Sequence, residues 1–194
     1  MSEERREYFR IDDEIALDYR LIDEAEIDAV SERIHARFPD RFTVASSFTA
    51  TSRQMAQALH KVQNQSPELI RCLQAIDQKL NMLAQLFVSE EMHLDQQPTR
   101  EVNLSAGGLA FRSQHQIRTG SLLEMRIVLF PSLVGILTLS RVIHCEPISD
   151  SNVQFPWQVA VNFEQLRERD RELLVRHVMT KQTRQLRAER LEGD

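Results

Sequence analysis

The sequence has little of what marks a secreted, membrane-spanning or metal-stapled protein. Only two of its 194 residues are cysteines, and Cys72 and Cys145 are too far apart to indicate a disulfide framework or a metal site. The longest apolar stretch, residues 128–139, is interrupted by Pro131 and is too short to cross a bilayer. Residues 1–10 contain no apolar core of a signal peptide. We therefore expect a cytoplasmic protein without a membrane span.

Net positive charge and catalytic motifs are also scarce. The formal net charge of −5 argues against broad nucleic-acid binding, because that binding needs a positive surface. Any anionic ligand must then be held by a local cluster of arginines. The six histidines show no metal-ligand spacing, and the phosphate-binding loop, the dinucleotide fingerprint and the serine-nucleophile motif are all absent from the sequence. The sequence therefore predicts no enzymatic activity, no metal site and no cofactor.

Apolar periodicity divides the chain into a strand, a helical excursion and a series of further strands. A period of two over residues 13–22 predicts a half-buried strand. Helical spacing follows over residues 23–38 and 43–62, and Ser66 and Pro67 suit the N-cap and the first position of another helix. Further strands are expected over 100–104, 108–112, 123–129, 135–144 and 157–163, with a helix after Glu164.

The expected fold class is α+β, an antiparallel β-barrel with an inserted helical segment and a C-terminal helix. Residues 1–22 would form an N-terminal arm and the first strand, and residues 23–97 the helical insertion. Residues 98–180 would complete the barrel and its C-terminal helix, and residues 181–194 would be a frayed tail. The acidic run Asp12-Asp13-Glu14 is interpreted as a solvated turn.

The helix after Pro67 carries the most regular apolar pattern in the chain. Its apolar residues alternate steps of four and three, as at the a and d positions of a coiled coil. They are Leu69, Leu73, Ile76, Leu80, Leu83 and Phe87, and we call them the seam.

Two questions about the seam stay open at the level of sequence. Residues 55–62 share the heptad phase of the seam, so a single helix kinked at Pro67 is possible. We favour two separate helices, because proline disrupts a helix. The seam either packs within its own monomer or, as we expect, meets copies of itself. Leucine and isoleucine mix at both seam positions, which leaves the number of copies undecided.

Two short motifs contain residues suited to an anionic ligand. Arg6 and Arg10 form an Arg-x-x-x-Arg pattern in the N-terminal arm, which we expect to be mobile until something binds it. Residues 103–108, Asn-Leu-Ser-Ala-Gly-Gly, form an (Asp/Asn)-x-Ser-x-x-Gly pattern between two expected strands. Together the two motifs resemble those of the PilZ family, small β-barrel domains that bind the bacterial second messenger cyclic di-GMP.

The resemblance covers residues 5–22 and about 98–180, and it assigns the arm a role in binding. It implies that Arg6 and Arg10 hold phosphate and guanine groups, with Arg5 assisting. Arginine suits both targets, because its planar fork makes paired bonds to phosphate or to guanine O6 and N7. On an extended backbone the two arginines lie roughly 13 Å apart, about the length of the compact ligand.

The second motif would complete the binding site by this resemblance. Asn103 and Ser105 are two residues apart on a strand and share a face, where they can bond a guanine or a phosphate. Gly107 and Gly108 permit a positive φ and a close approach of the ligand to the backbone. Family members normally separate the two motifs by one short strand and its turn, whereas residues 23–97 intervene here.

The resemblance implies a non-catalytic receptor or adaptor for cyclic di-GMP. The protein would oligomerise through the insertion, as a tetramer or a dimer, and pass its signal to an unidentified protein partner in motility, biofilm or virulence control. Ordering of the arm on ligand binding would carry the signal. The alternative is an oligomeric PilZ-like scaffold that binds protein partners without nucleotide, because helical extensions can convert such domains into scaffolds.

Overall fold

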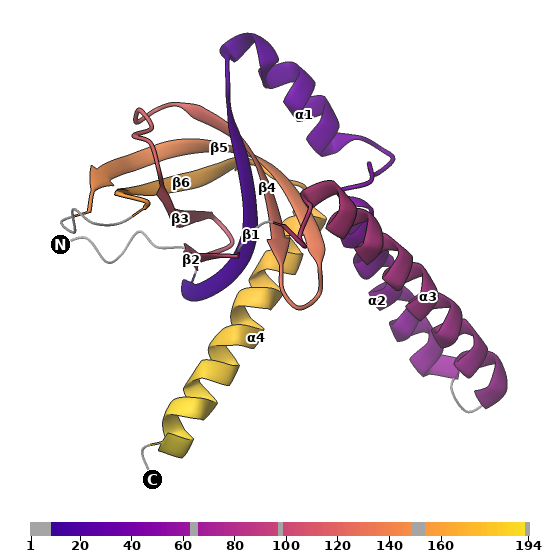
Figure 1. Cartoon of the computed structure of the whole chain (residues 1–194). Coiled ribbons are helices and arrows are strands. Elements are labelled where there is room, and N and C mark those ends of the chain that lie inside the picture. Colours follow the sequence, from indigo (N-terminus) through magenta and orange to yellow (C-terminus); the bar gives the residue numbers. More distant parts are fainter. Residues whose placement is uncertain (1–8, 63–65, 97–98, 149–153, 193–194) are drawn as a thin grey trace.

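Six strands close into an antiparallel barrel in the computed structural model, which describes residues 9–62, 66–96, 99–148 and 154–192 (Figure 1). The strands are β1 (Ile11–Ile22), β2 (Arg100–Leu104), β3 (Gly108–Ser113), β4 (Leu122–Leu129), β5 (Val134–Pro147) and β6 (Trp157–Gln165). Their order around the barrel is β1-β2-β3-β6-β5-β4. The α+β barrel expected from the sequence is confirmed.

Strand β1 closes the barrel by pairing with two neighbours. Its first half, Ile11 to Ile15, pairs with β2, and its second half, Ile15 to Ile22, pairs with β4. The chain leaves β1 for the helices and returns as β2, which lies directly beside β1. The inserted helices therefore leave the strand pairing of the barrel intact.

The insertion contains a short 3₁₀ turn, η1, and three α-helices. Their bounds are η1 (Glu24–Glu26), α1 (Ile27–His35), α2 (Val44–Val62) and α3 (Pro67–Met92). Helices α2 and α3 are separate, as favoured from the sequence, and Pro67 begins α3. The two helices form a hairpin in which Ser52 Oγ lies 2.5 Å from Asp77 Oδ1 and 3.0 Å from Asn81 Nδ2. Figure 1 shows this hairpin projecting from the barrel.

Two hydrophobic layers lie on either side of the barrel wall. Residues inside the barrel, such as Met125 and Ile127, pack with Leu174 of the C-terminal helix α4 (Glu168–Glu192). Outside it, Val128 packs in a second cluster with Ile34 of α1 and Val88 of α3. Strand β4 is consequently buried on both faces, although sequence alternation alone describes a half-buried strand.

Helix α4 continues to Glu192, through most of the segment for which the sequence predicts a frayed tail, residues 181–194. Lys181 bonds the carboxylate of Asp13, and Gln185 Nε2 donates to the backbone oxygen of Asp12 at 3.4 Å. Residues 181–192 are also mostly good helix formers. No helix in the described part of the chain is both long and apolar enough to span a membrane.

Most of the seam of α3 is not buried within the monomer. Leu69, Ile76 and Leu83 are 57%, 49% and 52% exposed, and Leu80 and Phe87 are exposed as well, whereas Leu73 is half-buried. The buried residues of α3 lie on another face, at Ala84, Val88 and Met92. Packing of the helix onto its own chain therefore leaves the seam largely open to solvent.

Close packing between β3 and β6 requires a glycine at position 108. Gly108 lies opposite Asn162, and a Cβ atom at this position would overlap the carbonyl oxygen of Val161. This backbone approach holds the turn after β2 against the next wall of the barrel.

We therefore expect Gly108→Ala to lower the free energy of unfolding by about 1–3 kcal/mol, because an added methyl forces the backbones apart. Ala110→Ser changes the same face of the same strand and should cost less than about 1 kcal/mol. Urea denaturation of both variants measures the difference. Equal stability losses would contradict the packing role of Gly108.

Candidate functional site

Pairing of β1 with β2 brings Arg10, the described arginine of the first motif, close to the second motif. Ile11 lies opposite Leu104, and Asp12 lies opposite Asn103. Arg10 directly precedes Ile11 and is exposed, so the antiparallel pairing places it at the Ser105 end of β2. Arg5 and Arg6 lie outside the described residues, and their place in the site stays a prediction.

Asn103 is held by Asp12, a residue that sequence reasoning missed. The Nδ2 atom of Asn103 donates a 2.8 Å hydrogen bond to Asp12 Oδ1. The Oδ1 atom of Asn103 accepts no hydrogen bond from the residues that the structure describes, so it is available to a ligand. The two side chains thus form a polar pair on the outer face of the barrel.

The interpretation of Asp12-Asp13-Glu14 as a solvated turn was wrong. These residues belong to β1, and Asp13 is only 5% exposed. Asp13 occupies a buried position between Ile11 and Ile15, where a charged residue interrupts the apolar alternation and hides the start of the strand. Extending the alternation from Ile15 back to Ile11 is the signal that could have revealed it.

Ser105 stabilises the turn between β2 and β3. It is 5% exposed, and its Oγ donates to the oxygen of Gly108 at 3.0 Å. The same Oγ accepts a 3.3 Å bond from the backbone nitrogen of Gly107. The hydroxyl is thus already engaged within the turn, and its contribution to a ligand site remains a prediction.

The two adjacent glycines serve the barrel as well as the turn. The Gly107 oxygen accepts a 2.9 Å bond from the nitrogen of Phe163, and Gly108 packs against β6. Neither glycine uses the positive φ that its lack of a side chain permits; among the described glycines that conformation occurs at Gly120, with φ 91°. The need for glycine at position 108 comes from the neighbouring strand.

A groove of about 650 Å³ runs beside the Asp12–Asn103 pair. This volume lies within the usual range for a small-molecule site. The charged side chains that line it are four carboxylates and two basic groups, from Asp12, Asp13, Glu14, Glu101, Arg112 and Lys181. The groove is therefore acidic overall, so an anionic ligand placed there needs additional positive charge from outside this lining.

Asp13 connects β1 to α4 underneath this groove. His177 Nε2 lies 2.5 Å from Asp13 Oδ2, and Lys181 bonds the other carboxylate oxygen. Burial by itself raises the pKa of Asp13, but the hydrogen bonds and positive charge of His177 and Lys181 outweigh it and hold the pKa below the ordinary value of 3.8. The buried carboxylate is thus held in its charged form.

Comparison with known families and solved structures finds a matching family and a similar fold. The PilZ domain family matches residues 81–180, a range that begins within α3 and ends within α4. Strand β1 and the arginine motif lie outside the matched range. No curated protein matches the sequence.

A solved structure has a similar fold. It is a crystal structure of a pathogenic protein from Xanthomonas campestris, described as a tetrameric PilZ domain that self-assembles via a helical bundle. The match has a TM-score of 0.54 at 15% sequence identity and covers 93% of this chain and 91% of that chain. At this identity the match shows the fold alone, and with the family match it confirms the resemblance read from the two motifs.

Stability should depend on pH through Asp13. A carboxyl whose folded pKa is depressed stabilises the protein fully above its unfolded pKa, and that stability is lost as the pH falls through the folded pKa. We expect Asp13→Asn to lower the free energy of unfolding by about 1.5–3 kcal/mol near pH 7, because charge-assisted hydrogen bonds are lost. The difference from the wild-type protein should shrink as the pH falls below 3.8.

Urea denaturation at several pH values tests this expectation. Asp18→Asn is the matched control, because Asp18 lies on the same strand and is exposed. A stability difference for Asp13→Asn that stays constant down to pH values well below 3.8 would contradict the assignment.

Proposed function

Because this chain belongs to the PilZ domain family, a family of cyclic di-GMP receptors, we propose that it is a non-catalytic receptor or adaptor for this second messenger. In this proposal the protein binds cyclic di-GMP on the outer face of β1 and β2. It assembles with copies of itself through α3 and passes the signal to a protein partner. The proposal places these events in the cytoplasm and links them to motility, biofilm or virulence control.

The register between β1 and β2 is the observation that carries this proposal. It puts Asp12 opposite Asn103 and Ile11 opposite Leu104, so Arg10, which directly precedes Ile11, lies at the Ser105 end of β2. Arg10, the described arginine of the first motif, therefore lies at one end of the strand pair whose Asp12 and Asn103 line the groove. A structural requirement of the barrel alone would not call for an exposed arginine at this point.

The groups at this edge complement the ligand in two ways. The Oδ1 of Asn103 and the carboxylate of Asp12 are acceptors, suited to the N–H groups of a guanine edge. Arg10, with Arg6 and Arg5, supplies guanidinium groups for a phosphate or for guanine O6 and N7. Acceptors for the base and donors for the phosphate would then come from adjacent positions on one strand pair.

The acidic lining of the groove makes the arginines of the arm essential to this proposal. The negative charge of Asp13 is offset by its bonds to His177 and Lys181. The carboxylates of Asp12, Glu14 and Glu101 are exposed at the groove. A dianionic ligand beside these carboxylates is repelled unless guanidinium groups lie between them. Binding should therefore depend strongly on the arm and weaken with added salt.

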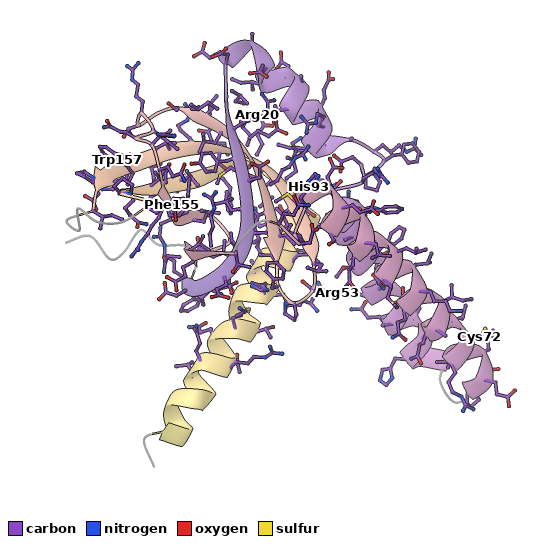
Figure 2. All side chains as sticks on the ribbon, in the orientation of Figure 1. Arg20, Arg53, Cys72, His93, Phe155 and Trp157 are labelled. Atoms are coloured by element: carbon purple, nitrogen blue, oxygen red, sulfur yellow. The ribbon has the colours of Figure 1, made fainter. Side chains whose placement is uncertain are left out.

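Self-assembly is supported by the exposed seam. Five of the six seam residues are exposed on a hairpin that projects from the barrel, with Cys72 labelled near its far end (Figure 2). An apolar stripe of this length on a monomer favours burial against another helix. The similar structure from Xanthomonas campestris is described as a tetramer formed via a helical bundle, which makes α3 the natural contact to propose here.

A scaffold that binds proteins without nucleotide is the second candidate. The acidic groove and the engagement of the Ser105 hydroxyl within its own turn favour it. The exposed seam is common to both candidates and does not distinguish them. Ligand binding does.

Calorimetric titration of cyclic di-GMP should show saturable binding at micromolar concentration or below. Arg6→Ala/Arg10→Ala should weaken it by about 100-fold or more, because two charge-assisted contacts are lost at roughly 1.5–3 kcal/mol each. Arg118→Ala removes an exposed arginine away from the groove and should leave affinity unchanged. Absence of binding to the folded wild-type protein would leave the scaffold as the function.

The seam can be tested separately by light scattering coupled to size-exclusion chromatography. Leu80→Glu places a charge at the centre of the seam and should reduce the mass of the assembly. Gln78→Glu adds the same charge at an exposed position of α3 outside the seam and should not. A wild-type protein with the mass of a single chain would contradict self-assembly.

A further inference from the structure

A second cavity lies between α2, α4 and the turn from β4 to β5. It has a volume of about 180 Å³. Figure 2 shows Arg53 where α2 approaches this turn and α4. Five basic side chains line the cavity and no Asp or Glu does so, in a chain whose net charge is −5. They are Arg53 from α2 and Arg176, His177, Lys181 and Arg184 from α4, and we call them the basic cleft.

Three of these cations have no counter-charge bonded to them. Arg53, Arg176 and Arg184 make no hydrogen bond or ion pair with any residue that the structure describes. Asp13 bonds His177 and Lys181 and is itself buried beneath them. Glu172 acts on Arg53 electrostatically but does not bond it. The three arginines of the cleft are therefore bonded to no carboxylate in the part of the chain that the structure describes.

Helix geometry concentrates this charge. Arg176, Thr180 and Arg184 are spaced four residues apart on α4, and His177 and Lys181 form a parallel row one position along. Lys181 and Arg184 are three residues apart and repel one another, and the charge of Arg176 acts against that of Arg53 on α2. Arg53 is half-buried, and its burial and the nearby charge of Arg176 lower its pKa from the usual value. The basic side chains of the cleft therefore repel one another, and a neutral polar side chain at one of these positions would remove that repulsion.

We propose that the basic cleft is a binding site for a phosphate group, either inorganic phosphate or the phosphate of a small phosphorylated molecule. A guanidinium group can bind a phosphate through two parallel hydrogen bonds. Thr180 adds a hydroxyl donor to the same lining, whereas the hydroxyls of Thr49 and Ser132 already donate to the oxygens of Ala45 and Leu129. The volume is below the usual range for a drug-sized ligand and suits one phosphate or pyrophosphate, not a whole cyclic dinucleotide.

This site is separate from the groove beside Asn103, and the inference does not rest on the proposed function. Lys181 is the lining residue that the two cavities share. Substitutions at Arg53 and Arg176 therefore test the basic cleft without altering the lining of the groove.

The test is thermal unfolding and calorimetric titration of the full chain with sodium phosphate, sodium pyrophosphate and glycerol phosphate. Sodium chloride at matched ionic strength is the reference. The wild-type protein should show a saturable rise in Tm and measurable heat with phosphate but not with chloride. A preference for glycerol phosphate over phosphate would indicate a phosphorylated molecule, and the reverse would indicate the free anion.

Arg53→Gln/Arg176→Gln should reduce phosphate affinity at least about tenfold. Without phosphate its Tm should equal or exceed that of the wild-type protein, because a mutual repulsion is removed. Arg37→Gln/Arg118→Gln removes the same charge elsewhere on the surface and should retain the phosphate response. A chloride response equal to that of phosphate, no heat with the wild-type protein, or an unaltered response in the cleft variant would each overturn the proposal.

Discussion

The pairing of one strand, β1, with two neighbours is the constraint on which the rest of this structure depends. Its second half binds β4 and closes the barrel, and its first half binds β2 and sets the register of the candidate site. That register places Asp12 against Asn103, and Arg10 directly precedes the paired residues of β1. The same strand carries Asp13, through which α4 is bonded to the barrel. The same strand pairing therefore closes the barrel and positions the residues of the candidate site.

Periodicity predicted most of the elements because each strand or helix buries one face. It placed the strands of the barrel within a few residues and identified Pro67 as the start of α3. It missed what depends on contacts between distant segments. Asp13 was interpreted as solvated because its partners lie on α4, and the packing role of Gly108 was missed because Val161 is far away in the sequence. The burial of β4 on both faces likewise depends on helices docking from the insertion.

Charge is unevenly distributed in this acidic chain. The groove beside Asn103 is lined mainly by carboxylates, whereas the basic cleft contains no carboxylate in its lining. Lys181 lines both the groove and the basic cleft, and it bonds Asp13. An anion in the groove would therefore need positive charge from outside the groove lining, whereas an anion in the basic cleft would meet cations already in place. The exposed seam of α3 lies on the hairpin that projects from the barrel.

The most direct test of this account is a crystal structure of the protein with cyclic di-GMP. The account predicts a guanine within hydrogen-bond distance of Asp12 or Asn103, and a phosphate or guanine held by Arg10. Cyclic di-GMP bound at another surface, with Arg10, Asp12 and Asn103 all free of contact, would contradict the claim that the β1–β2 register builds the ligand site.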